Sequence, residues 1–167
     1  MDIDQKKTAL RMIPYGLYIL TAESEDGRVA ASTVNWVTQT SFDPPLVVVG
    51  VKVDSLAHSI IKETKAFALN VLGKDQQGLA FTFFKSLERE GQTIGGETFQ
   101  AGQTGSPIFE STPAFVECNL VETVDRGDHS IFVGRVVNAG VNKAPEGRPD
   151  AATLWLKDLG EKVFYGG

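Results

Sequence analysis

The 167-residue sequence contains one cysteine and only two histidines, and this scarcity limits its chemistry. A single thiol, Cys118, cannot form a disulfide within the chain. Two imidazoles and one thiol are too few for an ordinary zinc or copper site, so we expect no metal. Because Cys118 alternates with Val116 and Leu120 along an apolar stretch, we interpret it as an inert core thiol.

Basic residues and long apolar runs are also lacking. Lysine and arginine total 16 against 21 acidic residues, a formal net charge of -5. Nucleic-acid phosphates require a basic face, so this balance argues against a nucleic-acid partner, although a local site for a small anion stays open. No run approaches the roughly 18 apolar residues that span a bilayer, and the N-terminal residues lack a signal-peptide pattern. We therefore expect a cytoplasmic protein that does not contact a membrane.

The remaining composition is that of a globular protein, with 42% hydrophobic and 22% charged residues. At this length we expect a single domain that covers residues 1–167. No G-x-G-x-x-G or P-loop spacing follows a predicted strand, so a Rossmann-type or Walker-type nucleotide site is not expected.

Stretches of β-forming residues separated by turns dominate the pattern. The expected strands cover residues 15–23, 29–41, 46–53, 66–73, 114–127 and 129–141, with a last strand near 152–156. The expected helices cover residues 3–12, 54–65 and 75–86, and residues 86–106 are expected to form a long polar surface loop. Because most strands are joined by turns rather than by helical crossovers, the pattern favours an antiparallel barrel or sandwich with appended helices.

Several side chains have an expected place in this fold. Strand 46–53 is nearly all apolar and reads as fully buried, with Gly50 at a bulge or a close backbone approach. Apolar contacts are expected for the first two helices, and a core position for one tryptophan. These residues are Ile3, Leu10 and Met12 in the first helix, Leu56, Ile60 and Ile61 in the second, and Trp155.

Small hydrogen-bonding side chains gather in residues 32–41, directly before the apolar strand. Their donors suit a planar heterocycle, although each residue is also acceptable in an ordinary strand or turn. A helix that begins at Ser55 offers free N–H groups and the positive end of its dipole, which favour a phosphate, and Lys52 adds positive charge. The residues alone therefore predict a ligand that is planar at one end and anionic at the other.

Three runs carry a more specific signal: ASTVNWVTQTSFDPPLVVVGVKVDSLAHSII, then FALNVLGKDQQGLAFTF, then GDHSIFVGRV. In this order and spacing they resemble the flavin reductase-like family, and the resemblance covers nearly the whole chain, to the KVFYGG tail. It implies a mainly β fold with a few short helices, arranged as an antiparallel Greek-key split β-barrel. It also implies a homodimer that binds FMN without a covalent bond near the dimer interface.

The resemblance also implies roles for individual residues. His129 falls at the position near the flavin ring and the nicotinamide, where its role is contact and orientation rather than proton transfer. A turn histidine bonded to Asp128 is the alternative. The implied cofactor-binding residues are Ser32, Thr33, Asn35, Trp36, Val37, Thr38, Gln39, Ser41, Val51, Lys52, Ser55, His58 and Lys85. For His58 the alternative is a neutral histidine on a helix surface, and for Trp36 an interface or core role.

The first functional hypothesis is therefore an NAD(P)H-dependent FMN reductase, an oxidoreductase that passes electrons from NADH or NADPH through flavin to an acceptor. The acceptor is free flavin for a partner monooxygenase, a ferric complex or a redox protein. A second hypothesis is a flavoredoxin-like FMN electron carrier without its own NAD(P)H oxidation. A third is a non-enzymatic barrel that binds a small ligand.

Overall fold

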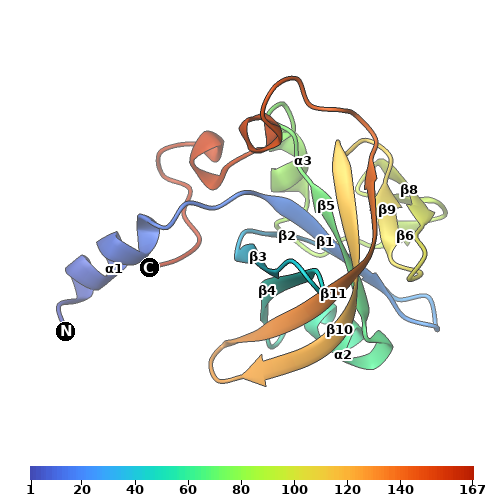
Figure 1. Cartoon of the computed structure of the whole chain (residues 1–167), viewed down its shortest axis with the longest axis horizontal. Coiled ribbons are helices and arrows are strands. Elements are labelled where there is room, and N and C mark those ends of the chain that lie inside the picture. The colour runs from blue at the N-terminus through green and yellow to red at the C-terminus, as the bar shows by residue number, and fades with distance from the viewer.

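The computed structural model describes residues 1–167, and a seven-stranded sheet forms its centre (Figure 1). All strand pairs are antiparallel, and the order is β2-β1-β5-β10-β11-β4-β3. The strands are β1 (Tyr18–Glu23), β2 (Val29–Val34), β3 (Val37–Ser41), β4 (Leu46–Lys52), β5 (Ala66–Val71), β10 (Ala114–Asp125) and β11 (His129–Val141). The prediction of a mainly β chain with a few short helices is confirmed.

The two edge strands of this sheet, β2 and β3, are consecutive in the chain. Only Asn35 and Trp36 separate them, so the sheet folds round until its first and last strands meet at this linker. No ladder pairs β2 with β3, and hydrogen bonds therefore do not close the sheet. The single strand predicted over residues 29–41 is wrong, because the chain leaves one edge at Val34 and joins the opposite edge at Val37.

Strand β4 shows why glycine stands within an apolar run. Its residues alternate between buried and partly exposed, with Val47, Val49 and Val51 facing inward, so the prediction of a fully buried strand is wrong. The predicted close approach at Gly50 is confirmed. A Cβ atom at this position would lie 3.0 Å from Cε3 of Trp36, and the Gly50 N–H donates to the Trp36 carbonyl at 2.9 Å.

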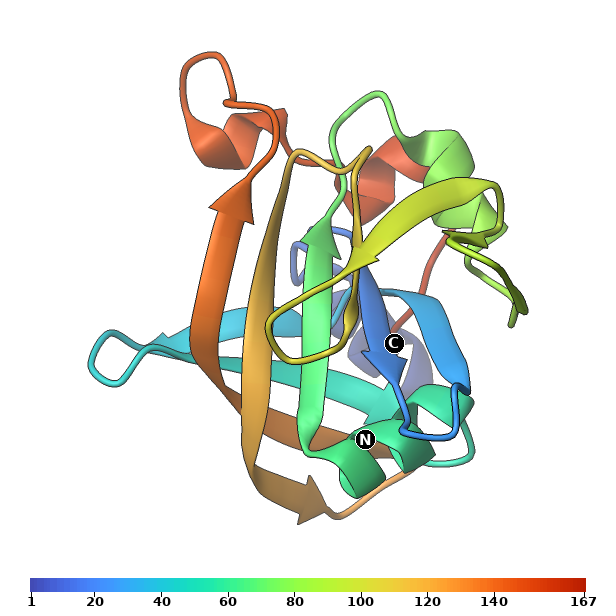
Figure 2. The same ribbon diagram turned by 90° about the vertical axis from the view of Figure 1, so that its right-hand side faces the viewer.

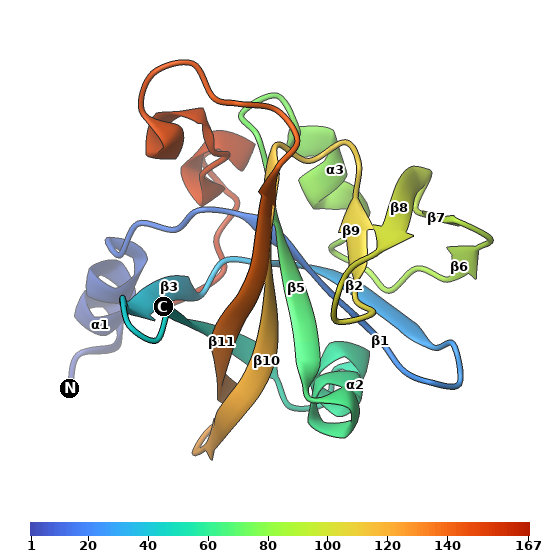
Figure 3. The same cartoon turned by 45° about the vertical axis from the view of Figure 1, so that its right-hand side comes forward.

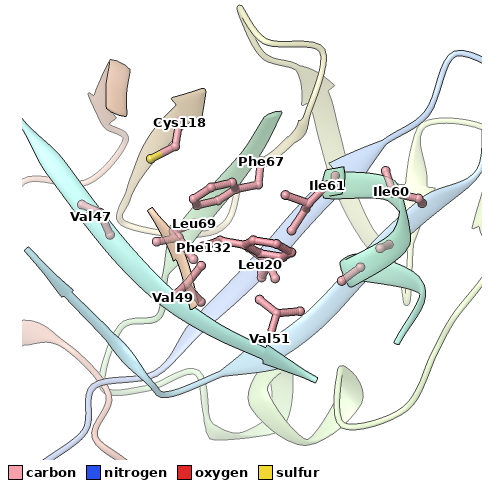
Figure 4. Packing of buried hydrophobic residues seen from close by; sticks show 13 residues of the cluster. Leu20, Val47, Val49, Val51, Ile60, Ile61, Phe67, Leu69, Cys118 and Phe132 are labelled. Atoms are coloured by element: carbon pink, nitrogen blue, oxygen red, sulfur yellow. The ribbon is translucent and has the colours of Figure 1, made fainter. Parts of the chain in front are cut away.

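Helix α2 (Leu56–Thr64) lies across one end of the folded sheet (Figure 2). Ile60 and Ile61 are fully buried, as predicted, and they pack with Phe67 and Phe132 in the first core cluster (Figure 4). The buried face of α2 consists of Ala57, His58, Ile60 and Ile61. Leu56 is turned to the edge of this face and is 41% exposed, so its predicted place in the buried stripe is wrong.

Residues 86–106 are more ordered than the expected surface loop. They supply β6 (Arg89–Glu90), β7 (Thr93–Ile94) and β8 (Glu97–Ala101), which pair with β9 (Pro107–Phe109) in a second sheet. Ile94 and Phe99 are buried in a second core cluster with Phe83, which follows α3 (Gln77–Thr82). The loop prediction is wrong because these two apolar side chains anchor an otherwise polar segment.

Buried Glu117 ties this segment to the main sheet. Its carboxylate accepts hydrogen bonds from the Thr104 N–H and hydroxyl, both at 2.8 Å, and from Asn138 Nδ2 at 2.6 Å. Burial alone would raise the pKa of Glu117, but these hydrogen bonds outweigh it and hold the pKa below the ordinary value. The charge is therefore compensated within the fold.

The two ends of the chain differ from their predictions. The predicted last strand is reduced to two isolated antiparallel bridges, from Thr153 to Gly73 and from Trp155 to Gly16. The 3-10 helices η1 (Pro149–Ala152) and η2 (Leu156–Leu159) flank them, and Trp155 is only partly buried. Helix α1 (Ile3–Arg11) is confirmed, but none of its residues is buried. The prediction of apolar contacts for Ile3, Leu10 and Met12 is wrong, because these side chains are exposed. No helix is both long and apolar enough to cross a bilayer.

Candidate functional site

A cavity of about 670 Å³ opens where the linker between β2 and β3 meets the N-terminal end of α2. Its volume falls in the range of small-molecule sites, which is about 300–1,000 Å³. The segment after α3 lines another side, as do residues 163–165 of the C-terminal tail (residues 163–167). The predicted site residues among its lining are Ser32, Thr33, Asn35, Val51, Lys52, Ser55, Lys85 and His129.

One end of the cavity is the N-terminus of α2, with Ser55 as its cap. The Ser55 hydroxyl accepts a hydrogen bond from the His58 N–H at 3.1 Å and donates to the Lys52 carbonyl at 2.7 Å. The N–H groups of Leu56 and Ala57 lie in the first turn, where a helix offers no internal acceptor. These free donors and the positive end of the helix dipole suit an anion.

Two lysines stand at the same cavity. The Lys52 ammonium lies 3.1 Å from Oδ2 of Asp54, and the hydrogen bond to Asp54 raises the pKa of Lys52. An incoming anion would compete with Asp54 for this exposed cation. Lys85 belongs to the segment after α3, which is held against β2 because the Thr33 N–H donates to the Phe83 carbonyl at 3.0 Å. The Thr33 hydroxyl also donates to the Ala80 carbonyl at 2.8 Å, so this rim is fixed at two points.

His129 lines the same cavity, directly across the β4–β11 pair from Lys52, and stands between two hydrogen-bond partners. Its Nδ1 lies 2.9 Å from Oδ1 of Asp128, and its Nε2 lies 2.7 Å from the Tyr165 hydroxyl. The hydrogen bond with His129 lowers the pKa of Asp128, so this carboxylate is ionised and only accepts. Nδ1 therefore carries a proton, and in the neutral ring Nε2 accepts from the Tyr165 hydroxyl. His129 thus makes the turn contact with Asp128 and lines the cavity at the same time.

Asn35 and Trp36 support this end of the cavity from behind. Asn35 is buried and its Nδ2 donates to the Tyr165 carbonyl at 3.0 Å. The Trp36 ring packs against His129 at a centroid distance of 4.6 Å and against Tyr165 at 5.3 Å. The indole Nε1 of Trp36 is buried without a hydrogen-bond partner in the chain, a cost of about 1–3 kcal/mol for a group of this kind.

Six of the predicted binding residues lie outside the cavity lining. Trp36 stands behind His129, and His58 is buried beneath β11, where its Nε2 lies 2.8 Å from the Ser130 hydroxyl. Burial and the nearby Lys62 ammonium lower the pKa of His58, which favours a neutral ring. The other four are Val37, Thr38, Gln39 and Ser41, which lie along β3. The binding roles of all six stay predictions.

The cavity also includes residues to which the sequence patterns gave no role. Phe83 and Phe84 close the side next to Lys85, and Phe164 and Tyr165 enter from the C-terminal tail. The tail sequence KVFYGG did contain a signal for a buried role: two aromatic residues stand in a short and otherwise polar chain end. No local pattern, however, indicates that a side chain at position 165 reaches His129, 36 residues away.

The chain can be compared with known proteins on this basis. The model of the family described as "Flavin reductase like domain" matches residues 10–158. The ferric-chelate reductase (NAD(P)H) of Archaeoglobus fulgidus is 34% identical, and the match covers 87% of this chain and 85% of the relative. The NADH-dependent flavin reductase StyB of Pseudomonas fluorescens is 31% identical, over 89% of this chain and 86% of the relative.

A solved structure agrees with these relatives. The styrene monooxygenase flavin reductase of Pseudomonas putida S12 matches with a TM-score of 0.70 and 29% identity, over 82% of this chain and 87% of that one. Other curated relatives are longer proteins: the chain spans 41% to 59% of the length of three of them and 23% to 25% of three more.

Proposed function

The chain belongs to the flavin reductase-like family, and on this premise we propose that it is an NAD(P)H-dependent FMN reductase. The flavin site is the cavity between α2 and the C-terminal tail. The functional unit is a single domain, and its folded sheet corresponds to a Greek-key split barrel. The consecutive edge strands β2 and β3 support this assignment of the fold.

The observation that carries the proposal is a single cavity that combines an anion site with a flat wall. The free N–H groups of α2, with Lys52 and Lys85, supply donors and positive charge. His129, next to Lys52 on the neighbouring strand and backed by the Trp36 ring, supplies a flat, hydrogen-bonded wall. FMN has a planar ring at one end and a terminal phosphate at the other. The negative charge of this terminal phosphate matches the free N–H groups and the positive dipole end at the start of α2.

The residues of the chain bind and orient rather than move protons. When bound, the flavin accepts a hydride from NADH or NADPH and passes electrons onward. His129, with Nδ1 held by Asp128, presents a fixed ring edge against which the nicotinamide lies, and this orientation is the main contribution of the protein. The apolar side chains of Phe83, Phe84 and Leu156 exclude water from the same space.

The proposal also covers the electron acceptor and the oligomeric state. The names of the relatives support two acceptors: a ferric complex, or free oxidised flavin that is reduced here and then serves a partner monooxygenase. We propose a homodimer with the flavin near its interface. Support comes from the exposed apolar side chains of Ile3 and Leu10 on α1 and of Met12, its C-cap.

An anaerobic titration tests this function. Protein saturated with FMN is mixed with NADH or NADPH, and the visible flavin absorbance is followed. Bleaching by either nucleotide supports the reductase. Bound flavin that neither nucleotide bleaches identifies an electron carrier instead, and protein that does not bind FMN at all identifies a different small-ligand barrel.

A further inference from the structure

We propose that Tyr165 is a positioning residue for His129 and that the C-terminal tail, residues 163–167, is a fixed wall of the nicotinamide end of the cavity. The proposal rests on the proposed function for its kinetic consequence. It concerns a segment that lies beyond residues 10–158, the part of the chain that matches the family. Figure 1 and Figure 3 both show the C-terminus next to α1.

The contact between Tyr165 and His129 completes the hydrogen bonding of the imidazole. Asp128 accepts from Nδ1 at 2.9 Å and the Tyr165 hydroxyl donates to Nε2 at 2.7 Å. Because the two bonds lie at opposite corners of the ring, they fix both its tautomer and its rotation. Trp36 packs against His129 and Tyr165 together, which leaves the ring little freedom to tilt.

The tail that carries Tyr165 is anchored at separate points. Asn35 donates to the carbonyl of Tyr165 at 3.0 Å, and Arg11 Nε donates to the carbonyl of Gly166 at 3.2 Å. The Arg11 guanidinium also lies over the Phe164 ring at 4.3 Å, within the range of a cation–π contact. Helix α1, which buries none of its own side chains, is thus linked to the cavity through the tail.

The tail acts as a wall and not as a plug. The cavity keeps about 670 Å³ with the tail in place, which is ample for a small-molecule ligand. Phe164 and Tyr165 also line a second cavity of about 450 Å³ on the α1 side, so the tail is a partition between two spaces. Loss of the tail contacts would therefore loosen the nicotinamide end without freeing space that the flavin needs.

The substitution Tyr165→Phe tests the proposal because it removes one hydroxyl and keeps the ring that packs on Trp36. With FMN saturating, we expect the KM for NADH to rise about 3- to 10-fold, the equivalent of one lost hydrogen bond. We expect kcat to change less than about 2-fold, because the lost contact serves ground state and transition state alike. Tyr15→Phe is the matched control, since Tyr15 lines only the second cavity.

A second variant approaches the tail from its other anchor. Arg11→Met removes the bond to Gly166 and the charge above Phe164, and Arg11 does not line the flavin cavity. We expect the KM for NADH to rise in this variant too, by a smaller factor than in Tyr165→Phe. A rise in flavin affinity or kcat in either variant would show that the tail blocks the site, which would overturn the proposal. Equal effects of Tyr165→Phe and Tyr15→Phe on KM would also overturn it.

A spectroscopic measurement separates this proposal from the proposed function. The ring ¹⁵N shifts of the two histidines are assigned with His129→Gln, in protein without added nucleotide. We expect the Nε2 resonance of His129 to shift on Tyr165→Phe and to stay in place on Tyr15→Phe. An unchanged Nε2 resonance in Tyr165→Phe refutes the positioning role. If the wild-type protein oxidises neither NADH nor NADPH, the proposed function fails, whereas this spectrum still decides whether Tyr165 holds His129.

Discussion

His129 on β11 is the ladder partner of Lys52 on β4, so one antiparallel strand pair places these two residues side by side at the cavity. Lys52 stands three residues before the cap of α2, and His129 carries the contacts to Asp128 and Tyr165. Because backbone hydrogen bonds fix this register, the position of His129 relative to the start of α2 is built into the fold. A preformed site of this kind binds without a large ordering cost.

The close approach of Gly50 to Trp36 gives a prediction about the cavity wall that His129 and Trp36 form. In Gly50→Ala the new methyl group would lie 3.0 Å from the indole ring and push it toward His129. We expect a loss of about 1–3 kcal/mol in the free energy of unfolding, measured by chemical denaturation, together with weaker flavin binding. Gly78→Ala is the control: nothing lies within 4 Å of a Cβ there, and alanine within a helix stabilises by up to about 1 kcal/mol.

The predictions from the sequence succeeded where the signal is local. The alternation of apolar residues indicates the long β10–β11 pair, and Ser55 caps α2 as its residue type predicts. The break at Asn35 and Trp36 could not be predicted, because β-forming residues continue across it and only the folding of the whole sheet separates the two strands. Tyr165 was missed for a similar reason, since its partner is distant in the sequence.

Cys118 gives a prediction about chemical reactivity. Burial among Phe67 and the neighbouring strands raises the pKa of its thiol to about 12. The reactive thiolate is therefore scarce at about pH 8, and the side chain is fully buried. We expect no labelling by a thiol reagent in native buffer and complete labelling of one thiol per chain after unfolding in guanidinium. Rapid labelling of the native protein would contradict this packing.

His58 gives a prediction about pH. Its pKa is lowered by burial and by Lys62, while Asp125 acts in the opposite direction. The unfolded chain takes up a proton near the ordinary value of 6.5, before the folded chain does. The free energy of unfolding should therefore fall as pH drops below about 6.5. The total loss is about 1.4 kcal/mol for each unit by which folding lowers the pKa of His58.

Denaturation between about pH 7.5 and pH 5 measures this effect, because ordinary carboxylates titrate below this window. In His58→Gln the slope over the window should decrease, since glutamine keeps a polar partner for Ser130 but does not titrate. An equal slope in both proteins would assign the pH dependence to another group.

The proposed site places the flavin phosphate at the N-terminus of α2, and Ser55→Asp tests this placement most directly. Aspartate is also a good N-cap, so the helix and the fold should be kept, while a negative charge enters the anion-binding end. Equilibrium binding of FMN and of riboflavin, which lacks the phosphate, is measured by flavin fluorescence for wild type and variant. We predict a loss of about 30-fold or more in FMN affinity, with riboflavin affinity changed less than about 3-fold. An equal change for both flavins, or none for either, would contradict the placement of the phosphate at α2.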